Sequence, residues 1–174
     1  MTTTVVVLAD THLRPGGAAR LPDSVHRALD RADVVLHAGD IVTADLLHEL
    51  SSWAPVHAVL GNNDHDPALA HLPVRRIEVL DGVRVAMVHD SGPRAGRAGR
   101  VRRWFPDAAV VIFGHSHVPA NETGVDGQLL FNPGSPTQKR AQPDPTFGVL
   151  TLHDGRIVDS RIVVVGSDAP APPR

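Results

Sequence analysis

The sequence predicts an α/β protein in which two sheets pack face to face with helices outside them. In the first part of the chain, short apolar runs alternate with amphipathic segments, a pattern typical of strands and helices in a parallel sheet. In the second part, apolar runs are joined by Asp-Gly turns, which are typical of hairpins. Several apolar runs also end in polar or charged residues, and in open α/β sheets ligands collect at such strand ends.

The composition is typical of one domain of ordinary size. The chain has 174 residues, of which 42% are hydrophobic and 21% are charged, and it has no cysteine. A chain of this length buries roughly 70% of the surface that its unfolded form exposes, so its core needs no cross-links. The absence of cysteine excludes disulfides, thiolate metal sites and cysteine nucleophiles. We expect a single domain over residues 1–165 and a disordered, Pro/Ala-rich tail over residues 166–174.

The charge and the N-terminus argue against several partners and locations. The net charge of −2 is too close to neutral to indicate nucleic-acid or membrane binding. The segment Met1–Thr4 has no basic residue before the first apolar run, which argues against a signal peptide. No apolar run approaches the ~20 residues that a membrane-spanning helix needs. We therefore expect a soluble, cytoplasmic protein.

The first part of the chain is expected to form three strands and two helices. Strands are expected at the short apolar runs Val5–Leu8, Val34–Leu36 and Val56–Leu60. A helix is expected from about Ser24 to Arg31, with Asp23 as its cap. A second helix is expected to begin near Thr43, because three leucines then fall on one face.

The second part is expected to form three hairpins around Asp-Gly pairs at 81–82, 126–127 and 154–155. The strands expected there are Arg76–Leu80, Val83–Val88, Leu129–Phe131, Phe147–Leu152 and Arg156–Val165. Between the first two hairpins we expect a helix that ends at Trp104 and a buried strand at Val110–Phe113.

Potential metal ligands follow five of the apolar runs within two or three residues. They are Asp10, His12, Asp40, Asn62, His89, His115 and His117. Neighbouring strands would bring these ends to one edge of the sheet. Seven ligands are too many for one ion that also holds water and substrate. They suit two ions about 3.5–4 Å apart that share a bridging group, and Asp40 lies in the middle of the series.

Each of these residues also has a simpler interpretation. Asp10 could cap a turn, Asp40 could cap the helix near Thr43, Asn62 could occupy a turn, and His89 could be an ordinary core histidine. Independent turns do not explain why acids, amides and imidazoles, and no lysine, follow five successive strands. The metal interpretation is therefore favoured. Without sulfur donors, we expect two divalent ions, with Mn first among Mn, Fe, Zn, Co and Ni.

The strand-end residues form an ordered series of motifs. They are Asp10-x-His12, Gly39-Asp40, Gly61-Asn62-x-Asp64, His89 and Gly114-His115-x-His117. Their order and spacing resemble the calcineurin-like metallophosphoesterase superfamily. The short chain and the Asn-Pro-Gly-Ser at 132–135 resemble its small, single-domain phosphodiesterase branch. The resemblance covers Val5 to about Ser135.

The resemblance implies a four-layer α/β/β/α sandwich of two mixed sheets flanked by helices. It also implies two ligand sets that share Asp40 as the bridge. One ion would be held by Asp10, His12, Asp40 and His117. The other would be held by Asp40, Asn62, His89 and His115.

Two positions depart from the pattern of many members of this superfamily. Asn63 stands where many carry a histidine directly after the metal-binding asparagine, and His89-Asp90-Ser91 stands where many show His-Gly-His. Both changes remove proton donors near the substrate and leave the ligands in place. Asn63 can donate a hydrogen bond to a phosphate oxygen but cannot act as an acid. We expect it to be the catalytic side chain beside the metals.

The activity implied by the resemblance is hydrolysis of phosphodiester bonds in a small or nucleotide-like substrate. Two bound ions would make hydroxide available near neutrality, and we expect this hydroxide to attack phosphorus in line. One alternative is a non-catalytic scaffold for protein interaction on the same fold, like the retromer subunit that this branch resembles. A phosphomonoesterase is another. Because histidine must be neutral to ligate, we expect metal loss as the pH falls below about 6.

The remaining partner expectations concern the surface. Five arginines between Arg94 and Arg103 could grip phosphate or nucleic acid, but we favour a solvated helix face, from which at most Arg94 or Arg97 reaches the site. The near-neutral charge argues against a nucleic-acid partner. Exposed hairpin edges, with Trp53 or Trp104, could serve a homodimer.

Overall fold

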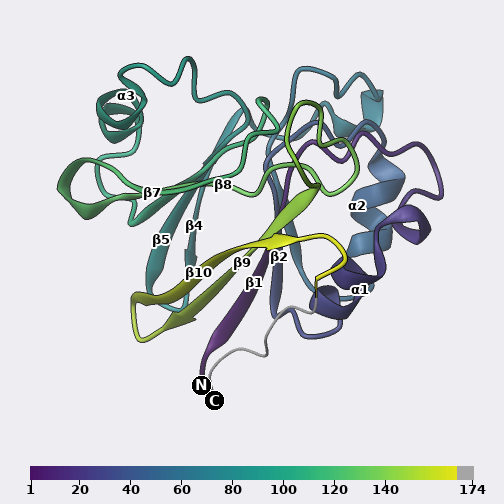
Figure 1. Cartoon of the computed structure of the whole chain (residues 1–174), viewed down its shortest axis with the longest axis horizontal. Coiled ribbons are helices and arrows are strands. Elements are labelled where there is room, and N and C mark those ends of the chain that lie inside the picture. Colours follow the sequence, from purple (N-terminus) through teal and green to yellow (C-terminus); the bar gives the residue numbers. More distant parts are fainter. Residues whose placement is uncertain (168–174) are drawn as a thin grey trace.

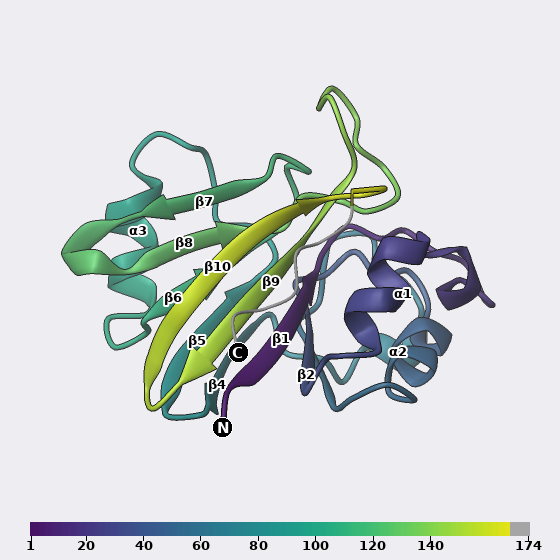
Figure 2. The ribbon, with the colours of Figure 1, turned by 60° about the horizontal axis from the view of Figure 1, so that its bottom comes forward.

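The structure is a computed structural model, and it describes residues 1–167 of the chain. Within this part, two five-stranded sheets lie face to face and α-helices cover their outer faces (Figure 1 and Figure 2). The predicted α/β sandwich of two mixed sheets flanked by helices is confirmed. Of the tail predicted to be disordered, all but Gly166 and Ser167 lies outside the described residues. None of the described helices is long and apolar enough to cross a membrane.

The first sheet contains the predicted βαβ units and has the strand order β10-β9-β1-β2-β3. Its strands are β1 (Thr3–Leu8), β2 (Val34–His37), β3 (Val56–Ala58), β9 (Thr146–His153) and β10 (Arg156–Val164). The strands β1, β2 and β3 are parallel, whereas the β9–β10 hairpin adds antiparallel strands beside β1. The connections carry the 3-10 turn η1 (Ala18–Arg20) and the helices α1 (Asp23–Leu29) and α2 (Ala44–Leu50).

The second sheet has the strand order β4-β5-β6-β8-β7. Its strands are β4 (Arg75–Leu80), β5 (Val83–Val88), β6 (Val110–Ile112), β7 (Ala120–Thr123) and β8 (Leu129–Asn132). The strands β5, β6 and β8 are parallel, and the hairpins β4–β5 and β7–β8 are antiparallel. Helix α3 (Arg97–Trp104) connects β5 to β6, and the 3-10 turns η2 (Pro67–Leu69) and η3 (Val125–Gly127) precede β4 and β8.

The core is divided into layers by the alternation of side chains along the strands. In β1, Val6 and Leu8 pack with residues of α1 and α2, whereas Val5 and Val7 pack with residues of the second sheet. A third apolar cluster lies between the second sheet and α3, and it includes Val101. Because successive side chains of a strand point to opposite faces, a strand buried on both faces must be apolar throughout. The apolar runs in the sequence reflect this double burial.

The ends of the helices differ from the sequence prediction. Asp23 is the first residue of α1 and makes no cap hydrogen bond, because Pro22 occupies the cap position. The Asp23 carboxylate instead lies in the first helical turn, where it faces the positive end of the helix dipole. The predicted cap was therefore placed one residue too late, and α1 ends at Leu29 instead of Arg31.

The N-terminus of α2 is capped from a distant part of the chain. Thr43 occupies the cap position without a side-chain hydrogen bond, and the Ala44 amide donates to Asp66 Oδ2 at 2.8 Å. The alternative that Asp40 caps this helix is therefore wrong. Asp66 satisfies an amide that the first helical turn otherwise leaves unpaired.

The two tryptophans considered for a dimer contact neighbours in their own chain. The Trp53 ring stacks on His26, and its Nε1 donates to Asp30 Oδ1 at 3.1 Å. The guanidinium of Arg75 lies 4.1 Å from the centre of the Trp104 ring. The homodimer stays a prediction.

Gly148 of β9 provides a test of how closely the two sheets pack. A Cβ atom at Gly148 would lie 2.4 Å from Cε1 of the buried ring of Phe131, which belongs to the other sheet. We expect Gly148→Ala to lower the free energy of unfolding by about 1–3 kcal/mol, because a core that is already filled must shift. Urea unfolding measures this change.

Gly99 of α3 is the control position for this substitution. A Cβ atom at Gly99 would lie 3.7 Å from its nearest neighbour, Arg103 Nη1, which is an ordinary contact distance. We expect Gly99→Ala to raise the free energy of unfolding by about 0.5–1 kcal/mol, because alanine favours the helix. Equal effects of the two substitutions would contradict the proposed tight contact at Gly148.

Candidate metal centre

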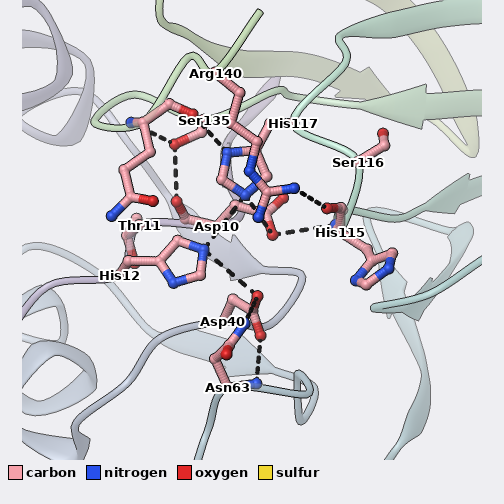
Figure 3. Close-up of polar contacts among 12 residues, drawn as sticks. Asp10, Thr11, His12, Asp40, Asn63, His115, Ser116, His117, Ser135 and Arg140 are labelled. Carbon is pink, nitrogen blue, oxygen red and sulfur yellow. Dashed lines mark hydrogen bonds and ion pairs between the residues drawn. The ribbon is translucent and has the colours of Figure 1, made fainter.

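The seven predicted ligands come together at the edge of the sandwich where β1, β2, β3, β5 and β6 end. Figure 3 shows Asp10, His12, Asp40 and His117 around one space, with His115 beside it. The His12 Nε2 atom lies 3.3 Å from His117 Nε2 and 3.5 Å from Asp40 Oδ2. The His117 Nε2 atom lies 3.6 Å from Asp10 Oδ1. Four of the predicted ligands are thus within direct reach of one another.

Of the remaining three predicted ligands, two histidines lie around the amide oxygen of the third, Asn62. Asn62 Oδ1 lies 2.9 Å from His89 Nε2 and 2.9 Å from His115 Nδ1. His89 Nε2 also lies 3.4 Å from Asp40 Oδ1. The two carboxylate oxygens of Asp40 therefore face different histidines, His12 on one side and His89 on the other. This is the arrangement that a bridging carboxylate requires.

The carboxylate and imidazole donor atoms alone form two compact groups that could each hold an ion. Among the described residues, Asp10, His12 and His117 offer atoms within 4.8 Å of one another, and so do Asp10, Asp40 and His89. Asp10 belongs to both sets, so it lies nearer to the middle of the cluster than the resemblance implied. Its Oδ2 atom is buried and has no hydrogen-bond partner. Because a buried oxygen without a donor is costly, a cation bound there would satisfy it.

The backbone at the ligands is unusual. Asp10, His12, Asp40, His115 and His117 have φ angles between +47° and +68°, in the left-handed region. Such conformations cost about 1–3 kcal/mol each and persist at sites where the surrounding structure imposes them. Here the Asp10 and His12 amides donate to the carbonyls of Gly39 and Asp40 at 3.0 Å. The first two ligand loops are thereby held against each other.

Gly61 allows the third ligand loop to approach the second. A Cβ atom at this position would lie 2.1 Å from the Asp40 amide nitrogen and 2.4 Å from Asp40 Oδ1. Asp64 then ties the two loops together, because its carboxylate accepts hydrogen bonds from the amides of Asp40, Val42 and Gly61. The orienting role expected for Asp64 is thus a set of three contacts to the backbone.

Carbonyl groups orient two of the imidazoles. His89 Nδ1 donates to the Ala38 carbonyl at 2.8 Å, and His117 Nδ1 donates to the Gln138 carbonyl at 2.5 Å. Because a carbonyl can only accept, Nδ1 carries a proton in each ring, so the neutral form of each ring presents the lone pair of Nε2 to a ligand. Such contacts are typical of histidines that bind metals.

Asn63 contacts Asp40 through two atoms. Its amide nitrogen donates to Asp40 Oδ1 at 2.8 Å, and its Nδ2 donates to Asp40 Oδ2 at 2.8 Å. The side-chain amide has two hydrogens, so one remains for a second acceptor. The contact with substrate expected for Asn63 stays a prediction, and the structure adds that this side chain positions Asp40.

The two carboxylates have opposite electrostatic environments. Burial raises the pKa of Asp10 to about 7, against the positive charge of His89. Burial would also raise the pKa of Asp40, but hydrogen bonds with His89 and Asn63 outweigh it and hold this pKa well below its usual range. Burial lowers the pKa of His12 and of His117, so both rings favour the neutral form that binds metals.

Arg140 is the residue near the site that the sequence analysis missed. It lies on the loop between β8 and β9, and its Nη1 donates to the His115 carbonyl at 3.4 Å (Figure 3). The same loop is attached to the first ligand loop, because Ser135 Oγ donates to the Asp10 carbonyl and Thr137 Oγ1 donates to the Thr11 carbonyl. The sequence feature that could have indicated this residue is the basic pair Lys139-Arg140, which follows the Asn-Pro-Gly-Ser motif.

The arginines of the α3 region contact other groups. Arg94 pairs with Glu122, and the Arg97 guanidinium lies 4.7 Å from the centre of the Phe113 ring. Arg100 donates to carbonyls of the loop that precedes the helix. The predicted solvated face is therefore only part of the outcome, because Arg94 is exposed whereas Arg97 and Arg100 are half-buried against their own chain.

The clustered acids and imidazoles form a candidate metal centre at one edge of an α/β/β/α sandwich. The family model described as the calcineurin-like phosphoesterase superfamily domain matches residues 3–155, and the chain belongs to this superfamily. The chain is 34% identical over 163 residues to a probable metallophosphoesterase of Methanothermobacter thermautotrophicus, with 92% of each chain covered. Membership supports a phosphoester hydrolase that uses divalent metals.

Two solved structures show the same fold. An archaeal phosphodiesterase superimposes with a TM-score of 0.67 at 21% identity, over 93% of this chain and 99% of that chain. Vps29 from Entamoeba histolytica, complexed with Zn²⁺, superimposes with a TM-score of 0.68 at 23% identity, over 94% of this chain and 100% of that chain. At these identities the similarity extends to the fold alone.

Metal affinity should depend on pH through Asp10. The pKa of Asp10 is about 7 and lies above its usual value, so protons compete with metal as soon as the pH falls below about 7. The pKa values of His12 and His117 are lowered by burial, so these rings favour the neutral form. For His89, burial is outweighed by Asp40, which raises the pKa of the imidazole, so this ring adds to the competition by protons. We expect the apparent Kd for Mn²⁺ to rise about tenfold between pH 8 and pH 6. Isothermal titration at constant ionic strength measures it, and a constant Kd over this range would contradict the role of Asp10.

Proposed function

We propose that this protein is a dinuclear metal-dependent phosphodiesterase that acts on a small or nucleotide-like phosphate ester. The observation that carries the proposal is the position of Asp40 between two groups of ligands. Its Oδ2 lies 3.5 Å from His12 Nε2 and its Oδ1 lies 3.4 Å from His89 Nε2. A single ion has no need of a carboxylate that faces two ways, whereas a pair of ions shares one.

The ligands fit two divalent ions. One ion would be held by Asp10, His12, Asp40 and His117, and the other by Asp40, Asn62, His89 and His115. Oxygen and imidazole donors without sulfur favour Mn, and they also suit Fe, Zn, Co or Ni. When bound, two such ions lower the pKa of water and neutralise the charge on a phosphate group.

The chain's own residues then hold the ester. Asn63 positions Asp40 with one hydrogen of its amide and can donate the other to a phosphate oxygen. Arg140 lies beside His115 and can place its guanidinium on a phosphate oxygen, a contact that arginine makes well because its donors form a planar fork. Neither residue can protonate the leaving group.

The lack of a proton donor at Asn63, Arg140 and Asp90 would restrict the substrate. Asp90, the residue after the ligand His89, is exposed, and its Oδ1 accepts from the Gly92 amide at 2.7 Å. Its carboxylate therefore stabilises its own loop and is not positioned as an acid. Esters whose leaving group needs no protonation should therefore react fastest.

A non-catalytic scaffold is the second candidate. The observation that favours it is the fold similarity to Vps29 from several organisms. The complete ligand set favours the enzyme, because a scaffold has no need to keep four imidazoles and two buried carboxylates together.

Metal stoichiometry and turnover together test the proposed function. We expect two ions per chain after loading with Mn²⁺, and hydrolysis of an activated diester such as bis(p-nitrophenyl) phosphate. Asp40→Asn should lower kcat by about 100-fold or more and reduce the number of bound ions, because the bridge loses its charge. Elemental analysis and a colorimetric assay measure the two quantities.

The control for this variant is Asp45→Asn, which removes the same charge from an exposed position of α2. It should keep both ions and full activity. Two ions per chain without turnover of a diester or a monoester would favour the scaffold, and one ion per chain would contradict the dinuclear centre.

Arg140 can be tested separately from the metals. We expect Arg140→Met to lower kcat/KM for the diester about tenfold, because a charged hydrogen bond to the phosphate is lost, while two ions remain bound. Arg140→Lys should recover part of the loss, since it keeps the charge without the planar fork. Arg14→Met, at an exposed loop residue, is the control. Unchanged kinetics in Arg140→Met would remove this residue from the substrate site.

A further inference from the structure

A cavity of about 330 Å³ adjoins the half of the metal centre that contains Asn62, His89 and His115. These three ligands line one side of it. The other lining residues are Leu60, Gly61, Val74, Arg75, Val88 and Asp90. A group bound in this cavity would therefore be continuous with a phosphate held at the metals.

The cavity lies where the edge strands of the two sheets meet. Leu60 follows β3, the edge of the first sheet, and its amide donates to the Pro73 carbonyl at 2.9 Å. Arg75 begins β4, the edge of the second sheet, and is paired with Val88 of β5. Because hydrogen bonds within and between these segments fix its walls, the cavity is part of the fold and needs no rearrangement to form.

Three aliphatic side chains give the cavity an apolar character. Val88 is buried, Leu60 is partly buried, and Val74 is 64% exposed. Val74 does not belong to any of the three apolar clusters found in the described residues. Cavities of this size, apolar with a few polar groups, are typical of sites for small organic ligands.

The charged groups of the cavity balance each other. Arg75 is held over Trp104, with its guanidinium carbon 4.1 Å from the ring centre, and Asp90 is tied to the Gly92 amide. One fixed positive and one fixed negative charge give no preference for an ionic ligand. A guanidinium has two faces, and the Arg75 face that Trp104 does not cover can stack on a flat ring of a ligand. The cavity therefore suits an uncharged group that contains an aromatic ring.

We propose that this cavity binds an uncharged, ring-bearing ester group of the substrate, and so selects aryl or nucleoside-like phosphate esters over alkyl esters. The proposal rests on the proposed function, because the ester phosphate is placed at the metal centre. It adds a recognition site for the organic part of the substrate.

Binding of two phosphonates to the Mn²⁺-loaded chain tests the cavity without turnover. Phenylphosphonate and methylphosphonate carry the same phosphonate group and differ in the ring. We expect the wild type to bind phenylphosphonate at least about tenfold more tightly, the order of discrimination that a hydrophobic pocket provides. Val74→Trp, which fills the cavity from an exposed position, should reduce this preference to about threefold or less.

Val158→Trp is the matched control, since Val158 is 50% exposed on β10 and does not line the cavity. It should keep the wild-type preference. Val74→Asp is a second variant, which should weaken binding of phenylphosphonate more than that of methylphosphonate. Equal affinities in the wild type, or a preference that survives both Val74 substitutions, would overturn the proposal.

Turnover separates this proposal from the proposed function. If the loaded chain binds phenylphosphonate preferentially but hydrolyses no ester, the cavity stands and the enzymatic function fails. If it hydrolyses bis(p-nitrophenyl) phosphate but shows no preference between the phosphonates, the function stands and the cavity proposal fails.

Discussion

The burial of two carboxylates, Asp10 and Asp40, within a cluster of imidazoles is the constraint on which the rest of the structure depends. A buried carboxylate is costly unless it is paired or hydrogen-bonded. Asp40 receives hydrogen bonds from the backbone and side chain of Asn63, whereas Asp10 keeps an oxygen without any partner. The chain thus satisfies both oxygens of Asp40, whereas one oxygen of Asp10 is left for a group from outside the chain, such as a cation.

This arrangement requires a rigid fold around the site. Five of the ligands have left-handed backbone conformations, which a flexible loop would abandon. They persist here because each loop begins at a strand whose side chains are buried on both faces, as Val5 to Leu8 are in β1. Asp64 and Ser135 then connect loops that are distant in the sequence. The apolar core and the polar centre therefore stabilise each other.

Much of the fold and of the candidate site could be predicted because each depends on local patterns. The apolar runs mark buried strands, the Asp-Gly pairs mark hairpins, and ligands at strand ends are brought together by the sheet. The cap of α2 could not be predicted, since Asp66 is distant from Ala44 in the sequence and only the tertiary fold places it there. The position of Arg140 and the cavity near Val74 could not be predicted for the same reason. Each results from contacts between segments that are far apart in the sequence, and no periodic pattern or motif spacing indicates such contacts.

The pairing of β1 with β9 affects the order in which the protein can assemble. The register places Thr3 opposite Leu152, so the central strand of the first sheet gains one of its two neighbours from near the end of the chain. During synthesis, most of the polypeptide must leave the ribosome before that neighbour exists. Contacts of such long sequence separation also slow folding. The candidate metal centre therefore reaches its final geometry only after this long-range pairing has formed, because Asp10 and His12 follow the strand that β9 supports.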